Sequence, residues 1–181
     1  MRFTLALAVL AGVAGMTGCA SAVAIHPLYT EQQLVSDLPL EGTWASGDGE
    51  AWQIQKSGDG YDVVALKRAD SPGGAKYTVH LLRLNEFHFV DVASKSDPDV
   101  GVPGHFLAKV QMQDGKLYVS PLDDTWFKHM MDAGVAPSST MGEGQQIVIT
   151  ASTAELQKFL LLYAADPDAW TEDDEGLRRL Q

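Results

Sequence analysis

Hydrophobic and polar side chains alternate along several stretches of the chain, with the period of two that is typical of half-buried β-strands. Trp52 and Ile54 alternate with glutamines, and the alternation resumes at residues 61–65 after a Ser-Gly-Asp-Gly turn. A hairpin closed by that turn places Ile54 opposite Val63 and Trp52 opposite Ala65. One face of this hairpin is apolar, so we expect it to face a core.

The stretch 105–120 predicts a second hairpin, because an Asp-Gly pair at its centre is a strong signal for a two-residue turn. This turn places Met112 opposite Leu117 and Val110 opposite Val119. The two pairs share one face, so we expect that face to be buried and the other to meet solvent.

The stretch 76–93 predicts a third hairpin, with a tight turn at Asn85, and this hairpin is apolar on both faces. Leucines and phenylalanines lie on one face, and valines with one leucine lie on the other: Leu82, Leu84, Phe87 and Phe89 against Val79, Leu81, Val90 and Val92. Strands that are apolar on both sides need cover on both sides. We therefore expect a helix to pack on the outside of this hairpin.

Two segments near the C-terminus predict helices. The first begins at Asp123 and Asp124, which we interpret as helix-capping acids, and the second begins with a capping box at Ser152. A short strand is expected between them, at residues 146–150. The whole pattern predicts a mainly β (α+β) fold: an antiparallel meander of about seven or eight strands, in a half-open or closed barrel, with two helices near the C-terminus.

The N-terminus has the composition of an export signal. Arg2 precedes an apolar stretch at residues 3–13, which is too short to span a bilayer, and small residues then lead to the only cysteine. The segment 16–19, Met-Thr-Gly-Cys, resembles the lipobox of bacterial lipoproteins, with methionine where leucine is commonest. The resemblance implies signal cleavage between Gly18 and Cys19, a diacylglyceryl thioether on Cys19, and a further acyl chain such as palmitate on the new amino terminus.

The lipoprotein resemblance also implies a location, a lipid anchor in the bacterial cell envelope. An aspartate directly after the lipidated cysteine would indicate retention in the inner membrane, and this chain has Ala20 there. We therefore expect the periplasmic side of the outer membrane if the host is Gram-negative. The alternative interpretation is an ordinary signal peptide with an incidental cysteine.

These patterns divide the chain into four expected regions. The boundaries are residues 1–18 for the signal peptide, 19–41 for a lipidated tether, 42–166 for the β-rich globular domain and 167–181 for an acidic, frayed C-terminal tail.

Charge and composition exclude several function classes. The formal net charge is −11, and an acidic chain is repelled by phosphates, so we expect no nucleic-acid partner. A lipidated Cys19 leaves no thiol for a disulfide, a metal or a nucleophile. The chain also lacks the common hydrolase, nucleotide, zinc and calcium motifs. We therefore predict a protein without enzymatic activity, without a cofactor and without a metal site.

Two groups of residues remain as candidates for a site. His80 and Asp91 face each other in the expected register, which could orient an imidazole for proton transfer, or they could form a plain cross-strand polar pair. Trp44, Trp52 and Tyr61 could line an apolar pocket, or they could simply fill the core of a small barrel.

Two further resemblances concern the globular part. The motif 42–44, Gly-Thr-Trp, on the first strand of a meander with a late helix resembles the calycin pattern of lipocalins, although a short strand between two helices departs from it. The order of His-Pro-Leu-Tyr at 26–29, Glu-Gly-Thr-Trp at 41–44 and a terminal helix at 155–157 resembles envelope lipoproteins of no assigned activity.

Three functions stay open. The leading one is an accessory lipoprotein that binds an unknown protein or a small apolar ligand at the envelope. A lipocalin-like carrier is the second, and it needs a continuous cavity beneath Trp44 and Trp52 of about 300–1,000 Å³. The third is a structural or assembly partner, which would expose an apolar patch or a bare sheet edge.

Overall fold

The computed structural model describes residues 22–70, 73–94, 104–142 and 146–180. The expected signal cleavage and lipidation at Gly18 and Cys19 lie outside these residues.

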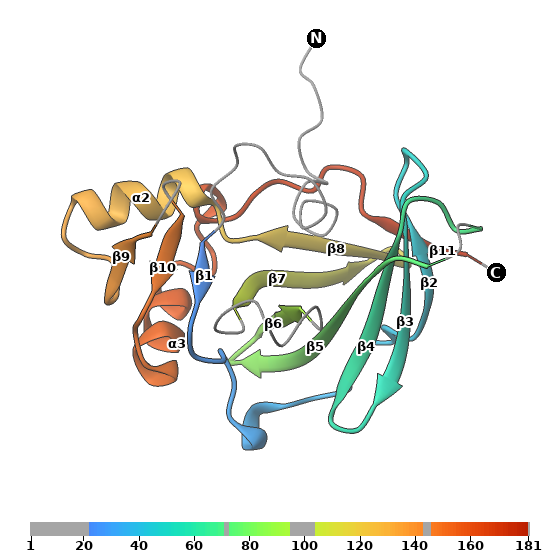
Figure 1. The fold of residues 1–181 in the computed structure, drawn as a ribbon, viewed down its shortest axis with the longest axis horizontal. Helices are drawn as coiled ribbons and strands as arrows, with labels where there is room; N and C mark the ends of the chain where they lie inside the picture. Colours follow the sequence, from blue (N-terminus) through green and yellow to red (C-terminus); the bar gives the residue numbers. More distant parts are fainter. Residues whose placement is uncertain (1–21, 71–72, 95–103, 143–145, 181) are drawn as a thin grey trace, which may run out of the picture.

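Eight antiparallel strands form a closed barrel (Figure 1). Each strand pairs with its neighbour in the chain, and the last one lies between β8 and β2, which closes the ring. The barrel strands are β2 (Gly42–Ala45), β3 (Ala51–Ser57), β4 (Gly60–Leu66), β5 (Ala75–Leu84), β6 (Phe87–Ser94), β7 (His105–Gln113), β8 (Lys116–Pro121) and β11 (Leu177–Leu180). The predicted barrel is therefore confirmed, in its closed form.

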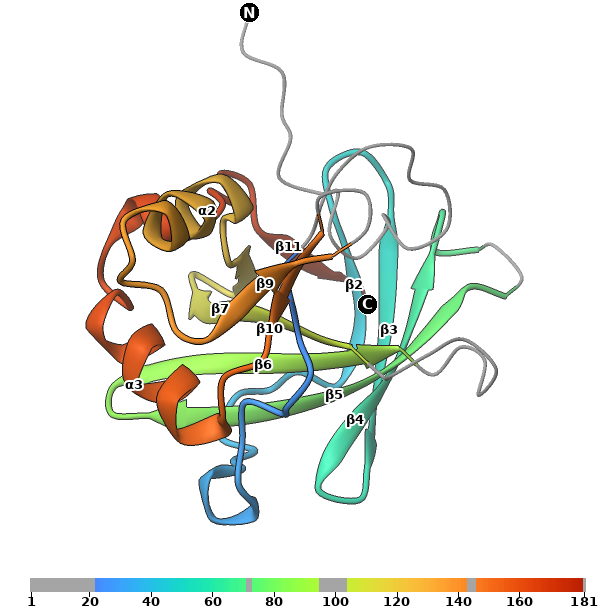
Figure 2. The same ribbon diagram turned by 60° about the vertical axis from the view of Figure 1, so that its left-hand side comes forward.

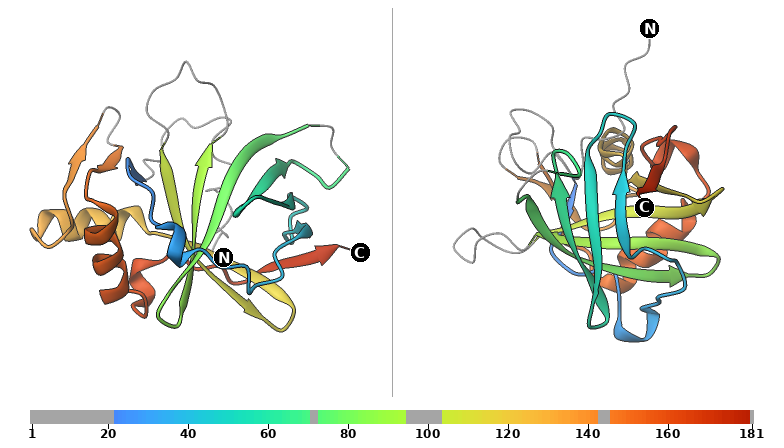
Figure 3. Two further views of the ribbon diagram at one scale, coloured as in Figure 1. Left: turned by 90° about the horizontal axis from the view of Figure 1, so that it is seen from below. Right: turned by 90° about the vertical axis from the view of Figure 1, so that its right-hand side faces the viewer.

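A second layer lies against one side of the barrel (Figure 2; Figure 3, left). It consists of the helices α2 (Asp124–Asp132) and α3 (Thr153–Leu162), and of the short strands β1 (Val23–Ala24), β9 (Ser139–Met141) and β10 (Ile147–Ile149). Two 3-10 turns, η2 (Glu31–Gln33) and η4 (Pro167–Ala169), complete the described elements. Strand β1 joins this layer to the barrel, because it pairs with β10 on one side and with β7 on the other.

The three predicted hairpin registers are all confirmed. Two of the turns depend on residues that tolerate left-handed backbone: Asn85 has a φ of 54° and Asp114 a φ of 51°. Asparagine and aspartate adopt this conformation more readily than other non-glycine residues, which is why they mark tight turns in the sequence.

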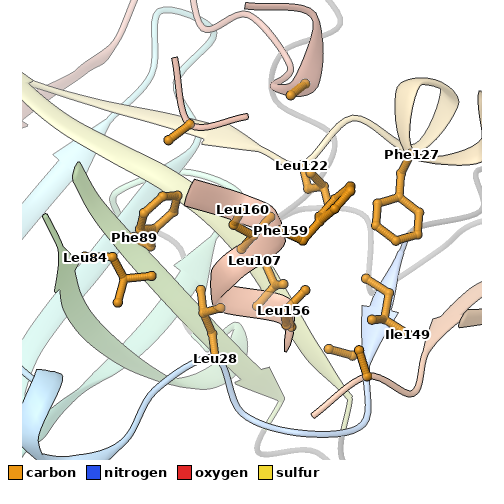
Figure 4. Packing of buried hydrophobic residues seen from close by; sticks show 14 of the residues in the cluster. Leu28, Leu84, Phe89, Leu107, Leu122, Phe127, Ile149, Leu156, Phe159 and Leu160 are labelled. Carbon is orange, nitrogen blue, oxygen red and sulfur yellow. The ribbon is translucent and has the colours of Figure 1, made fainter. Parts of the chain in front are cut away.

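The apolar side chains form two separate cores, one inside the barrel and one between the barrel wall and the second layer. In the hairpin β5–β6, Val79 and Val90 point into the barrel, whereas Leu84 and Phe89 point outward. Figure 4 shows Leu84 and Phe89 in the same cluster as Leu156 and Leu160 of α3. The expectation that a helix covers the outside of this hairpin is confirmed.

The segment expected to be a tether is packed against the barrel wall in its described part, residues 22–41. Ala24 and Leu28 are completely buried, Leu34 forms an isolated β-bridge with Leu82, and the Val35 N–H donates to the Leu81 carbonyl at 3.0 Å. The physical reason is the apolar outer face of β5 and β6, which α3 covers only in part. The segment has no period of two or 3.6, so its burial leaves no trace in the sequence pattern.

The C-terminal segment also differs from the expectation of a frayed tail. Trp170 is buried in the outer core, and residues 177–180 form the strand that closes the barrel. The Asp173 carboxylate fixes the approach to this strand, because it accepts hydrogen bonds from the N–H groups of Val119 and Gly176. The packed unit therefore extends over the described residues from 22 to 180.

Candidate functional site

A small apolar cavity lies inside the barrel, with a volume of about 50 Å³. Side chains from β3 to β8 and from β11 line it, together with Leu40. Trp52 and Tyr61 are among the lining residues, as the pocket hypothesis expected, whereas Trp44 is buried beside them without lining the cavity. The volume of about 50 Å³ is well below the roughly 300–1,000 Å³ that is usual for a ligand pocket, so side chains fill most of the barrel.

Two neighbouring tryptophans of the inner core differ in their hydrogen bonding. Trp44 and Trp52 are direct cross-strand partners on β2 and β3. The indole N–H of Trp44 donates to the Leu40 carbonyl at 2.7 Å. The indole N–H of Trp52 is buried and has no acceptor within the described part of the chain. A buried donor without an acceptor destabilises the folded state by about 1–3 kcal/mol. A ligand with a hydrogen-bond acceptor next to Trp52 would remove this cost.

Cationic side chains lie over aromatic rings of this inner core. The guanidinium of Arg179 is 5.9 Å from the ring centroid of Trp44 and donates to the Glu41 carbonyl at 2.5 Å. Gly42 makes room for it, because a Cβ at this position would lie 2.9 Å from the Arg179 Nε. The Lys56 ammonium lies 4.5 Å from the ring centroid of Tyr61. These contacts are favourable cation–π interactions.

His80 and Asp91 are register partners on β5 and β6, as predicted, but their side chains have different hydrogen-bonding partners. The Asp91 carboxylate is completely buried and accepts two hydrogen bonds, one from the Leu28 N–H at 2.7 Å and one from His105 Nδ1 at 2.6 Å. His80 stacks on Tyr29, with the ring centroids 4.3 Å apart. His105, which the sequence did not single out, is therefore the residue that Asp91 orients.

The pairing of Asp91 with His105 has the geometry of an acid that orients a base. A nucleophilic mechanism would also need a hydroxyl or thiol within hydrogen-bond reach of the imidazole. Among the described residues, no serine, threonine or cysteine side chain is hydrogen-bonded to His80 or His105. Together with the Leu28 N–H bond to Asp91, the pair joins β6, β7 and the N-terminal segment.

Tyr29 is a further polar group at this wall of the barrel. Its hydroxyl lies 3.4 Å from the His80 Nε2. Burial raises the pKa of Tyr29, and the negative charges of Asp91 and Asp59 raise it further. Its phenol therefore stays protonated at neutral pH. No group of three or more possible metal-binding side chains occurs among the described residues.

The first described residue, Ala22, is hydrogen-bonded to the start of α2. Asp123 is the N-cap and accepts from the Trp126 N–H at 2.8 Å, which confirms its predicted capping role. Asp124 instead accepts from the N–H of Ala22 at 2.7 Å. Burial raises the pKa of Asp124 to about 6, the Ala22 hydrogen bond opposes this shift, and the Asp123 charge adds to it. Ala22 is only three residues beyond Cys19.

The surface offers a few exposed apolar side chains, at Val135, Met141, Leu162 and Leu180. They come from four different segments, and scattered apolar side chains are common on protein surfaces. In the part of the chain that the structure describes, every helix is too short or too polar to cross a bilayer.

No protein-family model, curated protein or solved structure gives a significant match to this chain.

Proposed function

We propose that this protein is a lipoprotein of the bacterial cell envelope, held to a membrane through acylated Cys19, and that it acts as a non-enzymatic binding or accessory protein. The observation that carries the proposal is the position of the only cysteine. It follows an apolar leader with small residues before it, and it lies three residues ahead of the folded unit. Two or more acyl chains at that position make a stable membrane anchor.

The arrangement of the folded unit is consistent with this role. Its apolar side chains are gathered in two internal cores, and the acidic residues give it a strong net charge that favours solubility. A body of this kind needs a covalent anchor to stay at a lipid surface, because an acidic chain is repelled by anionic headgroups.

Mass spectrometry of the protein isolated from bacterial membranes tests the proposal. We expect residues 1–18 to be absent and Cys19 to carry a diacylglyceryl group and an amide-linked acyl chain. The Cys19→Ser variant is the matched control. We expect this variant to carry no acyl chain and to be absent from the membrane fraction. An intact leader with an unmodified thiol in the wild-type protein would overturn the proposal.

The cavity is smaller than a lipocalin-like carrier needs, but one observation favours a second candidate function, the carriage of a much smaller apolar molecule. The unpaired indole N–H of Trp52 belongs to a side chain that lines the cavity in the barrel. A compact ligand with one hydrogen-bond acceptor would satisfy this donor. Because the cavity measures only about 50 Å³, anything larger than a few carbon atoms requires Trp52 or its neighbours to move.

Native mass spectrometry of the membrane-purified protein distinguishes the two functions. A carrier should retain a co-purified small molecule, and the Val110→Phe substitution, which fills the cavity, should release it. Val135→Phe is the control on the exposed surface and should leave the bound molecule in place. Ligand-free protein in all three preparations excludes the carrier function.

A further inference from the structure

We infer that the side of the molecule at the start of α2 lies against the membrane surface, and that η2 and the β3–β4 turn point away from it. The occupant of this surface is a lipid bilayer. The inference rests on the proposed lipidation of Cys19, and it adds an orientation that lipidation alone does not imply.

The first step is the attachment of the chain at residues 22–25. The Ala22 N–H is bonded to Asp124, and β1 is paired on both sides, with Val23 opposite Val148 and Ala24 opposite both Ile149 and His105. The Ile25 N–H adds a further bond to the Ile149 carbonyl at 3.0 Å. Because Ala24 is completely buried in this arrangement, the segment belongs to the folded unit and cannot swing as a linker.

The second step is the length of chain between this attachment and the lipid. Ala22 is three positions after Cys19, and even a fully extended chain spans at most about 10 Å over these three steps. A free tether over residues 20–38 would instead allow about 60 Å. The acyl chains are thus confined to the neighbourhood of Ala22, so the bilayer must approach this side of the molecule.

The third step identifies the two opposite sides. Ala22 is hydrogen-bonded to Asp124 at the start of α2. In Figure 1, α2 lies at the top of the molecule, whereas η2 and the β3–β4 turn lie at the bottom. Figure 2 and the right-hand view of Figure 3 show the same separation after rotation about the vertical axis. If the anchor emerges beside α2, the surface at η2 faces away from the membrane.

Acidic side chains are exposed on the side of the molecule that carries the start of α2. Residues 171–176, which run beside β8 toward β11, include the exposed acids Glu172, Asp174 and Glu175. On the exposed side of α2, the Lys128 ammonium pairs with Asp132 at 3.5 Å. Anionic lipids would repel these acids, so we attribute the orientation to the short covalent link. We therefore expect the same orientation on neutral and on anionic vesicles.

Fluorescence quenching of the reconstituted lipoprotein tests the orientation. Thr125, in the first turn of α2, and Asp59, in the β3–β4 turn, are both exposed, and each can be replaced by a single free cysteine and labelled. The vesicles contain phosphatidylcholine and a lipid with a nitroxide quencher on its headgroup. We expect the label on Thr125→Cys to be quenched several times more strongly than the label on Asp59→Cys.

A variant with twelve Gly/Ser residues inserted between Ser21 and Ala22 is the control. This variant should remain bound to the vesicles, but the two labels should be quenched to a similar extent. The reason is that the longer linker allows the folded unit to rotate relative to the bilayer. Equal quenching at both sites, or stronger quenching at Asp59→Cys, with the natural linker would overturn the inference.

Vesicle flotation separates this outcome from a failure of the proposed function. If the wild-type protein floats with the vesicles and the Cys19→Ser variant does not, anchoring stands and the quenching result decides the orientation. If the wild-type protein purified from membranes does not float, the lipid anchor itself is wrong and the orientation falls with it.

Discussion

The buried carboxylate of Asp91 accepts a hydrogen bond from Nδ1 of His105 at 2.6 Å, from the neighbouring strand β7. Its second oxygen accepts from the Leu28 N–H, so this single side chain joins two barrel strands to the N-terminal segment that crosses them. Breaking such a buried pair by removing one partner leaves the other donors without an acceptor in a low-dielectric environment.

Replacing Asp91 with alanine should therefore lower the free energy of unfolding by about 3–5 kcal/mol, as measured by urea denaturation. Asp59→Ala is the matched control, because its exposed carboxylate is 3.7 Å from the His80 Nε2 and should contribute less than about 1 kcal/mol. Hydrogen exchange at the Leu28 amide should accelerate in Asp91→Ala alone. Equal destabilisation by both substitutions would contradict the role we assign to Asp91.

Trp44 and Trp52 are cross-strand neighbours, and only Trp44 makes an indole hydrogen bond, so the same substitution at both positions isolates the contribution of that bond to stability. Phenylalanine at either position removes the same atoms, but only Trp44 loses a bond, the one to the Leu40 carbonyl. We expect Trp44→Phe to be more destabilising than Trp52→Phe by about 1–3 kcal/mol, because only the former leaves a carbonyl unpaired. Thermal or urea unfolding of both variants tests this, and a larger loss in Trp52→Phe would contradict it.

Packing of α3 against the barrel can be tested within a single helix. Leu160 is completely buried in the outer core, whereas Leu162 is 71% exposed. Leu160→Ala should destabilise the protein by about 2–5 kcal/mol, because it leaves a cavity at the surface that covers β5 and β6. Leu162→Ala should change stability by less than about 0.5 kcal/mol, as measured in the same urea titration. A similar loss in both variants would mean that α3 is not docked as described.

The raised pKa of Asp124 predicts a pH dependence of stability. Its pKa is raised from 3.8 to about 6, mainly by burial, so ionisation is less favourable in the folded state than in the unfolded state. The contribution of Asp124 to stability is complete below pH 3.8, the pKa of the carboxyl group in the unfolded state. It is lost as the pH rises through about 6, the pKa in the folded state. Asparagine keeps an oxygen for the Ala22 N–H and does not ionise.

The stability of Asp124→Asn relative to wild type should therefore increase as the pH rises from about 4 to about 7, in parallel urea titrations. A carbon-13 NMR titration of the Asp124 carboxyl group provides the independent value of the pKa. A stability difference that is constant or that falls with rising pH would contradict the assignment.

The sequence by itself determined the hairpins and the helix starts, because their signals are local. Asn85 and Asp114 mark turns that only a few residue types tolerate, and once a turn is placed, strand alternation sets the register and the buried face. The apolar outer face of β5 and β6 also predicted its helical cover. These conclusions need no information about distant parts of the chain.

Tertiary structure decided the features whose partners lie far away in the chain. Residues 177–180 form a strand because they pair with β2 on one side and with β8 on the other. Leu28 is buried because its side chain packs in the outer core and its N–H donates to Asp91. The register partner of Asp91 on β7 is Leu107, and its carboxylate bonds instead to the diagonal neighbour His105, a choice that register alone does not reveal. The cavity volume likewise depends on how side chains from seven strands pack together, so it cannot be predicted from a local sequence pattern.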